Sequence, residues 1–174
     1  QAGPSGNRTL TGPEAILDPA TRKQTLRSLS NGMYIVTSSA GARHGAATVT
    51  WLSQASFAPP LVMAAIRPES TVFQCLSESG IAAIHVLDES QQDLAFRFFR
   101  HTNVVGDTIN GEPFTAGLTG APILTNAAAY VECRVRRLIR IGDHAVVIFE
   151  VVEADCRRPV QPLTVAASPW CYGG

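Results

Sequence analysis

Apolar and polar residues alternate along residues 46–57, which predicts a β-strand with one apolar and one polar face. The apolar positions are Ala47, Val49, Trp51, Ala55 and Phe57, and the polar positions are Thr48, Thr50, Gln54 and Ser56. Leu52 and Ser53 interrupt the alternation, so we expect a bulge or a bend there. The polar face carries hydroxyls and an amide but no charge. It suits either an ordinary Thr-rich face of a sheet or a face that hydrogen-bonds a ligand.

Other apolar runs predict strands at residues 33–38, 61–66, 81–87, 130–141 and 145–154, with a further short strand at 162–165. Gly142 and Asp143 join the two long strands as a hairpin. Pro59 and Pro60 end the central strand, because neither residue can donate a hydrogen bond to a neighbouring strand. Residues 101–127 are rich in glycine and predict a long irregular loop, which in a small domain is often functional.

Three helices are expected, over residues 19–29, 71–79 and 91–100. Asp18 is the N-cap of the first, whose inner face is Leu26 and Leu29, and Ser70 is the N-cap of the second. Ser90 and Asp93 approximate a capping box for the third. In that helix the aromatic stripe of Phe96, Phe98 and Phe99 is read as core.

The fold class that follows is mainly β, with antiparallel pairing and helical additions. No strand–helix–strand alternation runs through the chain, and the hairpins favour antiparallel neighbours in a small β-barrel. Residues 1–17 are rich in Gly, Pro and Thr and are expected to form a flexible tail. Residues 18–174 are expected to form one domain.

Composition narrows the class of protein. The 174 residues are 45% hydrophobic and 16% charged, as in globular proteins, and the net charge is zero. No basic run favours a nucleic-acid partner, and no apolar run is long enough for a membrane-spanning helix. The four cysteines (Cys75, Cys133, Cys156 and Cys171) form no CxxC pair, and the start of the chain shows no secretion signal. Free thiols in a reducing cytoplasm are therefore expected, without a metal site.

The common catalytic motifs are absent. The chain has no GxGxxG or Walker loop, no GxSxG elbow, no HExxH and no evident carboxylate pair. If the protein performs chemistry, a cofactor is expected to supply it. The helix that starts at Ser70 and Thr71 offers unpaired amides, a positive dipole end and two hydroxyls, which suit an anion. Plain helix capping is the alternative.

Four segments, taken in order, resemble the flavin reductase-like family of FMN-binding split-barrel proteins. They are residues 48–62, 67–71, 117–124 and 142–152, the last followed by Pro162 and Leu163. The resemblance covers about residues 24–165. It implies a homodimeric split β-barrel of six or seven antiparallel strands, with a flavin near the subunit interface.

The resemblance also implies a set of site residues. Thr48, Val49, Thr50 and Trp51 would line the isoalloxazine edge, with Ser53, Gln54, Ala55 and Ser56 following toward the ribityl chain and phosphate. Ser70 and Thr71 would meet the phosphate, in agreement with the helix-start argument. His144 would lie near the reactive ring, where the nicotinamide stacks; a turn histidine that bonds a nearby carbonyl is the alternative. His44, His85 and His101 are expected to be structural or solvated.

The family resemblance favours an NAD(P)H-dependent flavin reductase, with FMN or FAD as cofactor and NADH or NADPH as co-substrate. Reduced flavin would then serve a partner monooxygenase, ferric iron or oxygen. Thr50 and Trp51 depart from the Asn and small residue of many relatives, and the aromatic end at residues 170–172 is uncommon, which affects substrate choice. The alternative is a non-catalytic flavin- or haem-binding protein, in which His144 or Tyr172 would ligate the haem.

Overall fold

The structure is a computed structural model and describes residues 18–174. Its contacts define two units, Ser30–Tyr172 and a smaller one that holds the residues up to Leu29 together with Gly173–Gly174. In the smaller unit, α1 spans Pro19–Arg27, and the Asp18 carboxylate caps it by accepting from the Thr21 amide at 2.8 Å. The expectation that Leu26 and Leu29 face inward is wrong, because both are exposed. The tail predicted at residues 1–17 lies outside the described residues.

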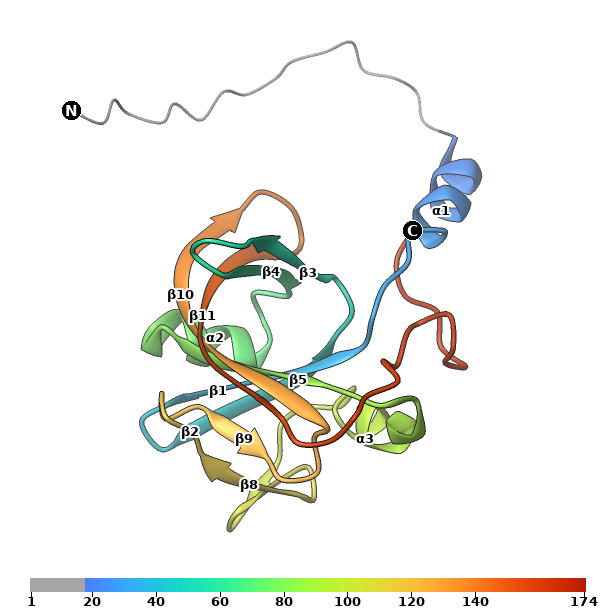
Figure 1. Ribbon diagram of the computed structural model, residues 1–174. Coiled ribbons are helices and arrows are strands. Elements are labelled where there is room, and N and C mark those ends of the chain that lie inside the picture. The colour runs from blue at the N-terminus through green and yellow to red at the C-terminus, as the bar shows by residue number, and fades with distance from the viewer. Residues whose placement is uncertain (1–17) are drawn as a thin grey trace, which may run out of the picture. The chain divides into compact units, whose positions relative to one another are not determined.

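The larger unit is built on a sheet of seven strands in the order β2-β1-β5-β10-β11-β4-β3, with every neighbouring pair antiparallel (Figure 1). The strands are β1 Tyr34–Ala40, β2 Arg43–Val49, β3 Leu52–Ser56, β4 Leu61–Ile66, β5 Ile81–Val86, β10 Ala129–Arg140 and β11 Ala145–Cys156. This confirms the mainly β, antiparallel fold class. Strand β4 has the predicted bounds, and β10 and β11 form the predicted hairpin.

The predicted central strand is two strands that form opposite edges of this sheet. Strands β2 and β3 stand at the two ends of the strand order, although only Thr50 and Trp51 separate them in the chain. The sheet must therefore curl round until one continuous segment supplies both edges. The Leu52 amide donates to the Thr50 carbonyl at 3.1 Å, and the Trp51 carbonyl accepts from the Ala65 amide at 2.9 Å.

The bend therefore lies at Thr50 and Trp51 rather than at Leu52 and Ser53. Two apolar positions predicted beyond it are also wrong, because Ala55 and Phe57 are exposed, Phe57 by 90%. The alternation does not continue across the bend, since β3 is an edge strand with most of its residues in solvent.

Helix α2, Thr71–Ser79, packs directly on β2 and fills the main core. Ser70 is its N-cap, as predicted, and Gly80 ends it in the left-handed region at φ 73°. A Cβ at Gly45 of β2 would lie 2.5 Å from the backbone of Val72, so only glycine permits this close contact. Phe73 and Leu76 are buried in the same core as residues of β1, β5 and β11. This contact fixes the start of α2 beside β2.

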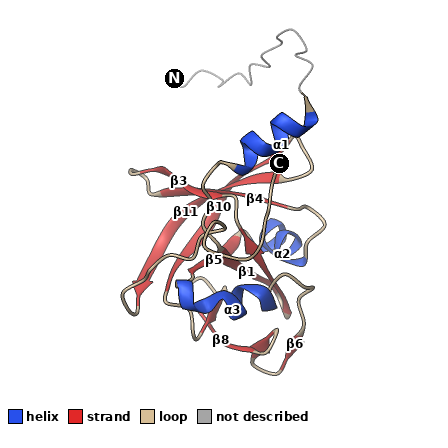
Figure 2. Cartoon of the chain, turned by 90° about the vertical axis from the view of Figure 1, so that its right-hand side faces the viewer, coloured by secondary structure: helices blue, strands red, loops and turns tan. Residues whose placement is uncertain are grey.

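Residues 101–127 are not an irregular loop. They contain β6 Val104–Val105, β7 Thr108–Ile109, β8 Glu112–Ala116 and β9 Pro122–Leu124, which form a small sheet in that order. The 3-10 helix η1 Glu89–Gln91 and helix α3 Gln92–Arg97 lie beside this sheet (Figure 2). Leu94 and Ala95 of α3 share a second core with Met33, Ile35, Ile109 and Leu163.

The third helix differs from its prediction in length, cap and packing. It ends at Arg97 and has no side-chain cap, whereas a capping box of Asp88 and Gln91, rather than of Ser90 and Asp93, starts the 3-10 helix η1 before it. Phe98 is buried, but Phe96 and Phe99 are 49% and 46% exposed, so only one ring of the stripe is core. The short strand expected at 162–165 is reduced to isolated bridges between Gly32 and Thr164 and between Asp88 and Pro162.

Two buried polar side chains connect the sheets. His85, fully buried in β5, hydrogen-bonds the Ile35 carbonyl through Nδ1 at 2.9 Å and accepts the Leu124 amide at Nε2 at 3.0 Å. Burial lowers the pKa of His85 to about 4. Glu132 of β10 accepts the amides of Leu118 and Thr119 at 2.9 and 2.7 Å. The structural role expected for His85 is therefore confirmed.

Three further features bear on the class of protein. All four cysteines are free, as expected, with Cys75 and Cys133 buried and Cys156 and Cys171 exposed. No helix within residues 18–174 combines the length and the apolar character needed to span a membrane. The same residues contain no group of three or more His, Cys, Asp and Glu side chains placed to hold a metal ion.

Candidate functional site

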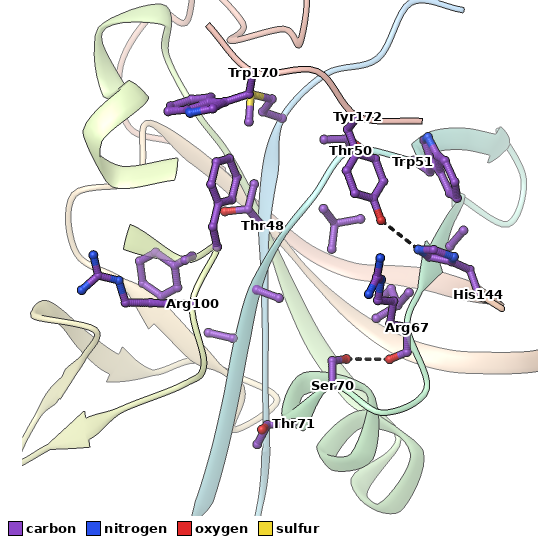
Figure 3. Close-up of a pocket in the computed structure, with 18 of the residues that line it drawn as sticks. Thr48, Thr50, Trp51, Arg67, Ser70, Thr71, Arg100, His144, Trp170 and Tyr172 are labelled. Atoms are coloured by element: carbon purple, nitrogen blue, oxygen red, sulfur yellow. Dashed lines mark hydrogen bonds between the residues drawn. The ribbon is translucent and has the colours of Figure 1, made fainter. Parts of the chain in front are cut away.

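A cavity of about 590 Å³ opens beside the bend between β2 and β3 (Figure 3). Its walls come from β2 and the bend, from the end of β4 and the start of α2, from residues 98–102, and from the C-terminal residues 170–172. Of the predicted site residues, Thr48, Val49, Thr50, Trp51, Ser70, Thr71 and His144 line it. The curl of the sheet and the seating of α2 on Gly45 bring these distant segments together.

Two threonines of the central segment face different environments. The Thr48 hydroxyl donates to the Ala95 carbonyl at 2.7 Å, and the Thr48 amide donates to the Phe98 carbonyl at 3.1 Å. Thr50 is only 7% exposed, and its buried Oγ1 has no hydrogen-bond partner within the described residues. An unsatisfied buried hydroxyl costs about 1–3 kcal/mol. Because Thr50 lines the cavity, its hydroxyl is available to a ligand there.

Positive charge and a helix start define another part of the cavity wall. The Ser70 hydroxyl donates to the Arg67 carbonyl at 2.7 Å and accepts from the Phe73 amide at 3.3 Å, so it is committed to capping. Thr71 at the helix start, Arg67 and Arg100 also line the cavity. Arg67 and Arg100 lie on opposite sides of the cavity (Figure 3), so an anion at the helix start would meet the Thr71 side chain and the positive end of the α2 dipole rather than both guanidinium groups. The plain-capping alternative holds for the Ser70 hydroxyl, and an anion site at Thr71 stays a prediction.

His144 lies at the centre of a polar and aromatic cluster. Its Nδ1 is 2.9 Å from the Asp143 carboxylate, and its Nε2 is 2.9 Å from the Tyr172 hydroxyl. The Trp51 ring lies 4.7 Å from the His144 ring and 5.2 Å from the Tyr172 ring, centroid to centroid. The alternative of a turn histidine bonded to a carbonyl is not what the structure contains. His144 instead bonds a carboxylate and a phenol.

The cluster around His144 also interacts electrostatically with the Arg67 guanidinium. The Tyr172 hydroxyl beside the Arg67 guanidinium raises the pKa of Arg67 above its ordinary value, and Glu69 and Asp143 add to that effect. The hydrogen bond from His144 and its charge hold the pKa of Asp143 below its usual range. Asp143 is therefore ionised near neutral pH and accepts a hydrogen bond from Nδ1 of His144.

The remaining predicted residues do not line the cavity. Ser53, Gln54, Ala55 and Ser56 lie on β3 at the far edge of the sheet, and the first three are exposed. Their assignment to the flavin stays a prediction. Conversely, Arg67 and Arg100 belong to the cavity but were not predicted. Arg67 stands three residues before the predicted cap Ser70, so its position could have suggested a role at the helix start, whereas nothing local marks Arg100.

Comparison with known proteins gives one consistent family. Residues 26–171 match the family model described as the flavin reductase like domain. The curated NADH-dependent FAD reductase of Streptomyces globisporus is 30% identical over 152 residues, which cover 82% of this chain and 80% of that protein. Diflavin flavoprotein A 1 of Synechocystis sp. is 29% identical over 130 residues. These residues make up 74% of this chain but only 23% of that relative, which is much longer.

A solved structure is similar over most of both chains. The styrene monooxygenase flavin reductase of Pseudomonas putida superimposes with a TM-score of 0.68 at 25% sequence identity, covering 82% of this chain and 90% of that one.

Proposed function

The chain belongs to the flavin reductase-like domain family, and we propose that it is a flavin reductase that passes hydride from NADH or NADPH to FMN or FAD. The observation that carries this proposal is the buried, partnerless hydroxyl of Thr50 in the cavity wall. A polar ring edge placed against Thr50 would satisfy that hydroxyl. The Arg67 side chain and the start of α2 at Thr71, which also line the cavity, would suit the phosphate of the same molecule.

The residues of the cavity fit a flavin in size and chemistry. Ligand cavities generally have volumes of about 300–1,000 Å³, mostly apolar walls and a few polar groups. The present cavity of about 590 Å³ falls in this range. Ala46, Ala47 and Val49 leave room along β2 for a flat ring system, while polar groups lie at its ends. Ser70 would support the phosphate site by fixing α2, since its hydroxyl is already used.

The chain's own residues would bind, orient and shield the reactants. A bound flavin supplies the redox chemistry, taking up hydride from the nicotinamide. Thr50 would hold a polar edge of the ring, and Trp51 and the surrounding apolar residues would exclude water. Asp143 would hold the His144 ring in one orientation at the cavity wall, with Nε2 bonded to the Tyr172 hydroxyl. No side chain needs to act as an acid or a base in the hydride step.

Partners and location form a further part of the proposal. We propose a homodimeric split barrel that provides reduced flavin to a partner monooxygenase in the cytoplasm. The name of the similar Pseudomonas putida reductase supports the oxygenase partner. The four free cysteines support a reducing compartment. Ferric iron or oxygen as acceptor would be revealed by reduction without the oxygenase.

Anaerobic reduction tests the activity. The purified protein is loaded with FMN or FAD and mixed in turn with NADH and NADPH, while the absorbance of oxidised flavin is followed. We expect the band to bleach with at least one nicotinamide, far faster than with free flavin. A flavin band that neither nicotinamide changes would contradict the reductase proposal and support a binding protein. A Soret band in the purified protein would instead support the haem alternative.

A second experiment tests the site through binding alone. Thr50→Val replaces the partnerless hydroxyl by a methyl group of similar size. We expect the ligand-free protein to gain about 1 kcal/mol of stability, because a buried unsatisfied group is removed. The same change should weaken FMN binding by about fivefold, the equivalent of one hydrogen bond. Thr48→Val is the matched control, since it removes a satisfied hydroxyl and should lower stability. Loss of stability without loss of affinity in Thr50→Val would refute the role of Thr50.

A further inference from the structure

The C-terminal wall of the cavity is attached differently from the other walls. Backbone hydrogen bonds hold the segment before it: the Val165 amide donates to the Asn31 carbonyl at 2.9 Å, and the Ser168 amide donates to the Val165 carbonyl at 3.2 Å. Within the described residues of the larger unit, Cys171 and Tyr172 have no backbone hydrogen bond to the barrel. Residues 170–172 are therefore held to the barrel mainly by their side chains.

Two side chains make these attachments on opposite sides of the cavity (Figure 3). The Trp170 ring stacks on Phe96 at 6.0 Å and meets Phe99 edge-on at 4.9 Å. The Tyr172 hydroxyl bonds Nε2 of His144 at 2.9 Å. Phe96 and Phe99 are half-exposed and belong to α3 and the turn after it, so the first attachment is on the surface. Segments with few buried contacts and no backbone pairing open at low free-energy cost.

The bond between Tyr172 and His144 is the polar attachment of this segment. Asp143 accepts from Nδ1 of His144 and so orients the ring, which places Nε2 against the Tyr172 hydroxyl. The phenol oxygen also lies near the Arg67 guanidinium and raises its pKa. Replacing Tyr172 by Phe would therefore remove both interactions while keeping the ring.

Tyr172 also controls access to the aromatic faces around it. Its ring is 6.4 Å from that of His144 and 5.2 Å from that of Trp51, and both pairs are edge-on. A flat ring needs about 3.5 Å on each side to stack between two others, or about 7 Å in all between parallel rings. Neither pair leaves this space. A flat ring such as a nicotinamide can therefore enter between Tyr172 and either of these rings only after Tyr172 has moved away.

We propose that residues 170–172 form a lid on the cavity, with Tyr172 as its latch on His144, and that the latch opens each time a nicotinamide binds. The inference rests on the proposed function for the identity of the entering ring. Tyr172 is in this account a positioning residue: it holds His144 in the closed state and competes with the nicotinamide for the space beside it. The contact of Trp170 with Phe96 and Phe99 is the second attachment of the lid.

Kinetics with Tyr172→Phe tests the competition. A closed fraction lowers the apparent affinity of a ligand that needs the open state. Loss of one hydrogen bond should shift that balance about fivefold, so KM for the nicotinamide should fall by about that factor. Tyr130→Phe is the matched control, because it removes a phenol outside the cavity lining. An unchanged or raised KM in Tyr172→Phe, or a loss confined to kcat, would overturn the latch.

Limited proteolysis tests the lid without turnover. Chymotrypsin cleaves after aromatic residues, so cleavage after Trp170 reports an open lid, and cleavage after the exposed Phe57 is the internal reference. We expect Tyr172→Phe to speed cleavage after Trp170 about fivefold relative to Phe57, and NAD⁺ to speed it in the flavin-loaded wild type but not in the variant. Equal cleavage in wild type and variant would refute the latch. Faster cleavage in the variant without any effect of NAD⁺ would support the lid but contradict its opening by a nicotinamide. Failure of the proposed function is therefore distinguished from failure of the latch.

Discussion

Lowering the pH from 7 to 5 should destabilise the barrel through one buried histidine, His85. Its two ring nitrogens are both in use: Nδ1 donates to the Ile35 carbonyl and Nε2 accepts the Leu124 amide. A second proton on Nε2 would face the hydrogen of that amide. Burial, opposed only in part by the bond to Ile35, lowers the pKa of His85 to about 4.

The magnitude follows from the difference between the two states. An unfolded histidine has a pKa of about 6.5, so from pH 6.5 down to about 4 the unfolded chain binds a proton that the native protein does not. Stability therefore falls as the pH falls. Each pH unit costs about 1.4 kcal/mol in the middle of this range, and the loss between pH 7 and 5 is about 2 kcal/mol. It levels off near pH 4 at a total of about 3 kcal/mol.

Urea unfolding at pH 7, 6 and 5 measures this effect when wild type is compared with His85→Gln. Glutamine keeps one donor and one acceptor but does not titrate, and His44, His101 and His144 are common to both proteins. We expect the free energy of unfolding to drop about 2 kcal/mol more in the wild type than in the variant over this range. Parallel pH profiles for the two proteins would refute the reasoning.

Three other predictions concern side chains buried in the barrel. Glu132→Gln should cost about 1–3 kcal/mol in urea unfolding and remove the hydrogen-exchange protection of the loop amides that the carboxylate binds; retained protection would contradict that role. Phe98→Ala should cost about 3–5 kcal/mol in the same assay, whereas Phe99→Ala at the half-exposed neighbour should cost far less, and equal losses would be inconsistent with the cores described. Burial raises the pKa of the Cys133 thiol to about 12, so native protein should be alkylated at Cys156 and not at Cys133 near pH 8, as mass spectrometry can check.

Local signals at both ends of an element allowed its bounds to be predicted. Strand β4 lies between Pro60 and the Arg67-Pro68 pair, and α2 lies between an N-cap serine and Gly80, so both have the bounds expected. The small sheet in residues 104–124 was missed for the converse reason. Its strands are two to five residues long and interrupted by glycines, so they carry no alternating pattern, and their pairing depends on contacts made elsewhere.

The candidate site was predictable to the extent that it is local. The uncharged alternation identified Thr48 and Thr50, and helix capping identified Ser70 and Thr71. Sequence could not show that the Ser70 hydroxyl is consumed by its own cap, nor that Arg100 and Tyr172 reach the same cavity. These facts depend on how the sheet curls and where the chain end lies, which no local pattern encodes.

The bend at Thr50 and Trp51 explains why the cavity lies where the sheet curls. A segment that supplies both edges of a curled sheet must leave one ladder before it enters the other, and the residues at that point lose regular strand neighbours. The Thr50 carbonyl accepts a hydrogen bond from the Leu52 amide, while the Thr50 hydroxyl stays buried without a partner within the described residues. At Trp51 the ring turns to His144 and Tyr172 instead of the core. The polar group and the aromatic face that a flavin and a nicotinamide would need are thus direct consequences of the way this sheet curls.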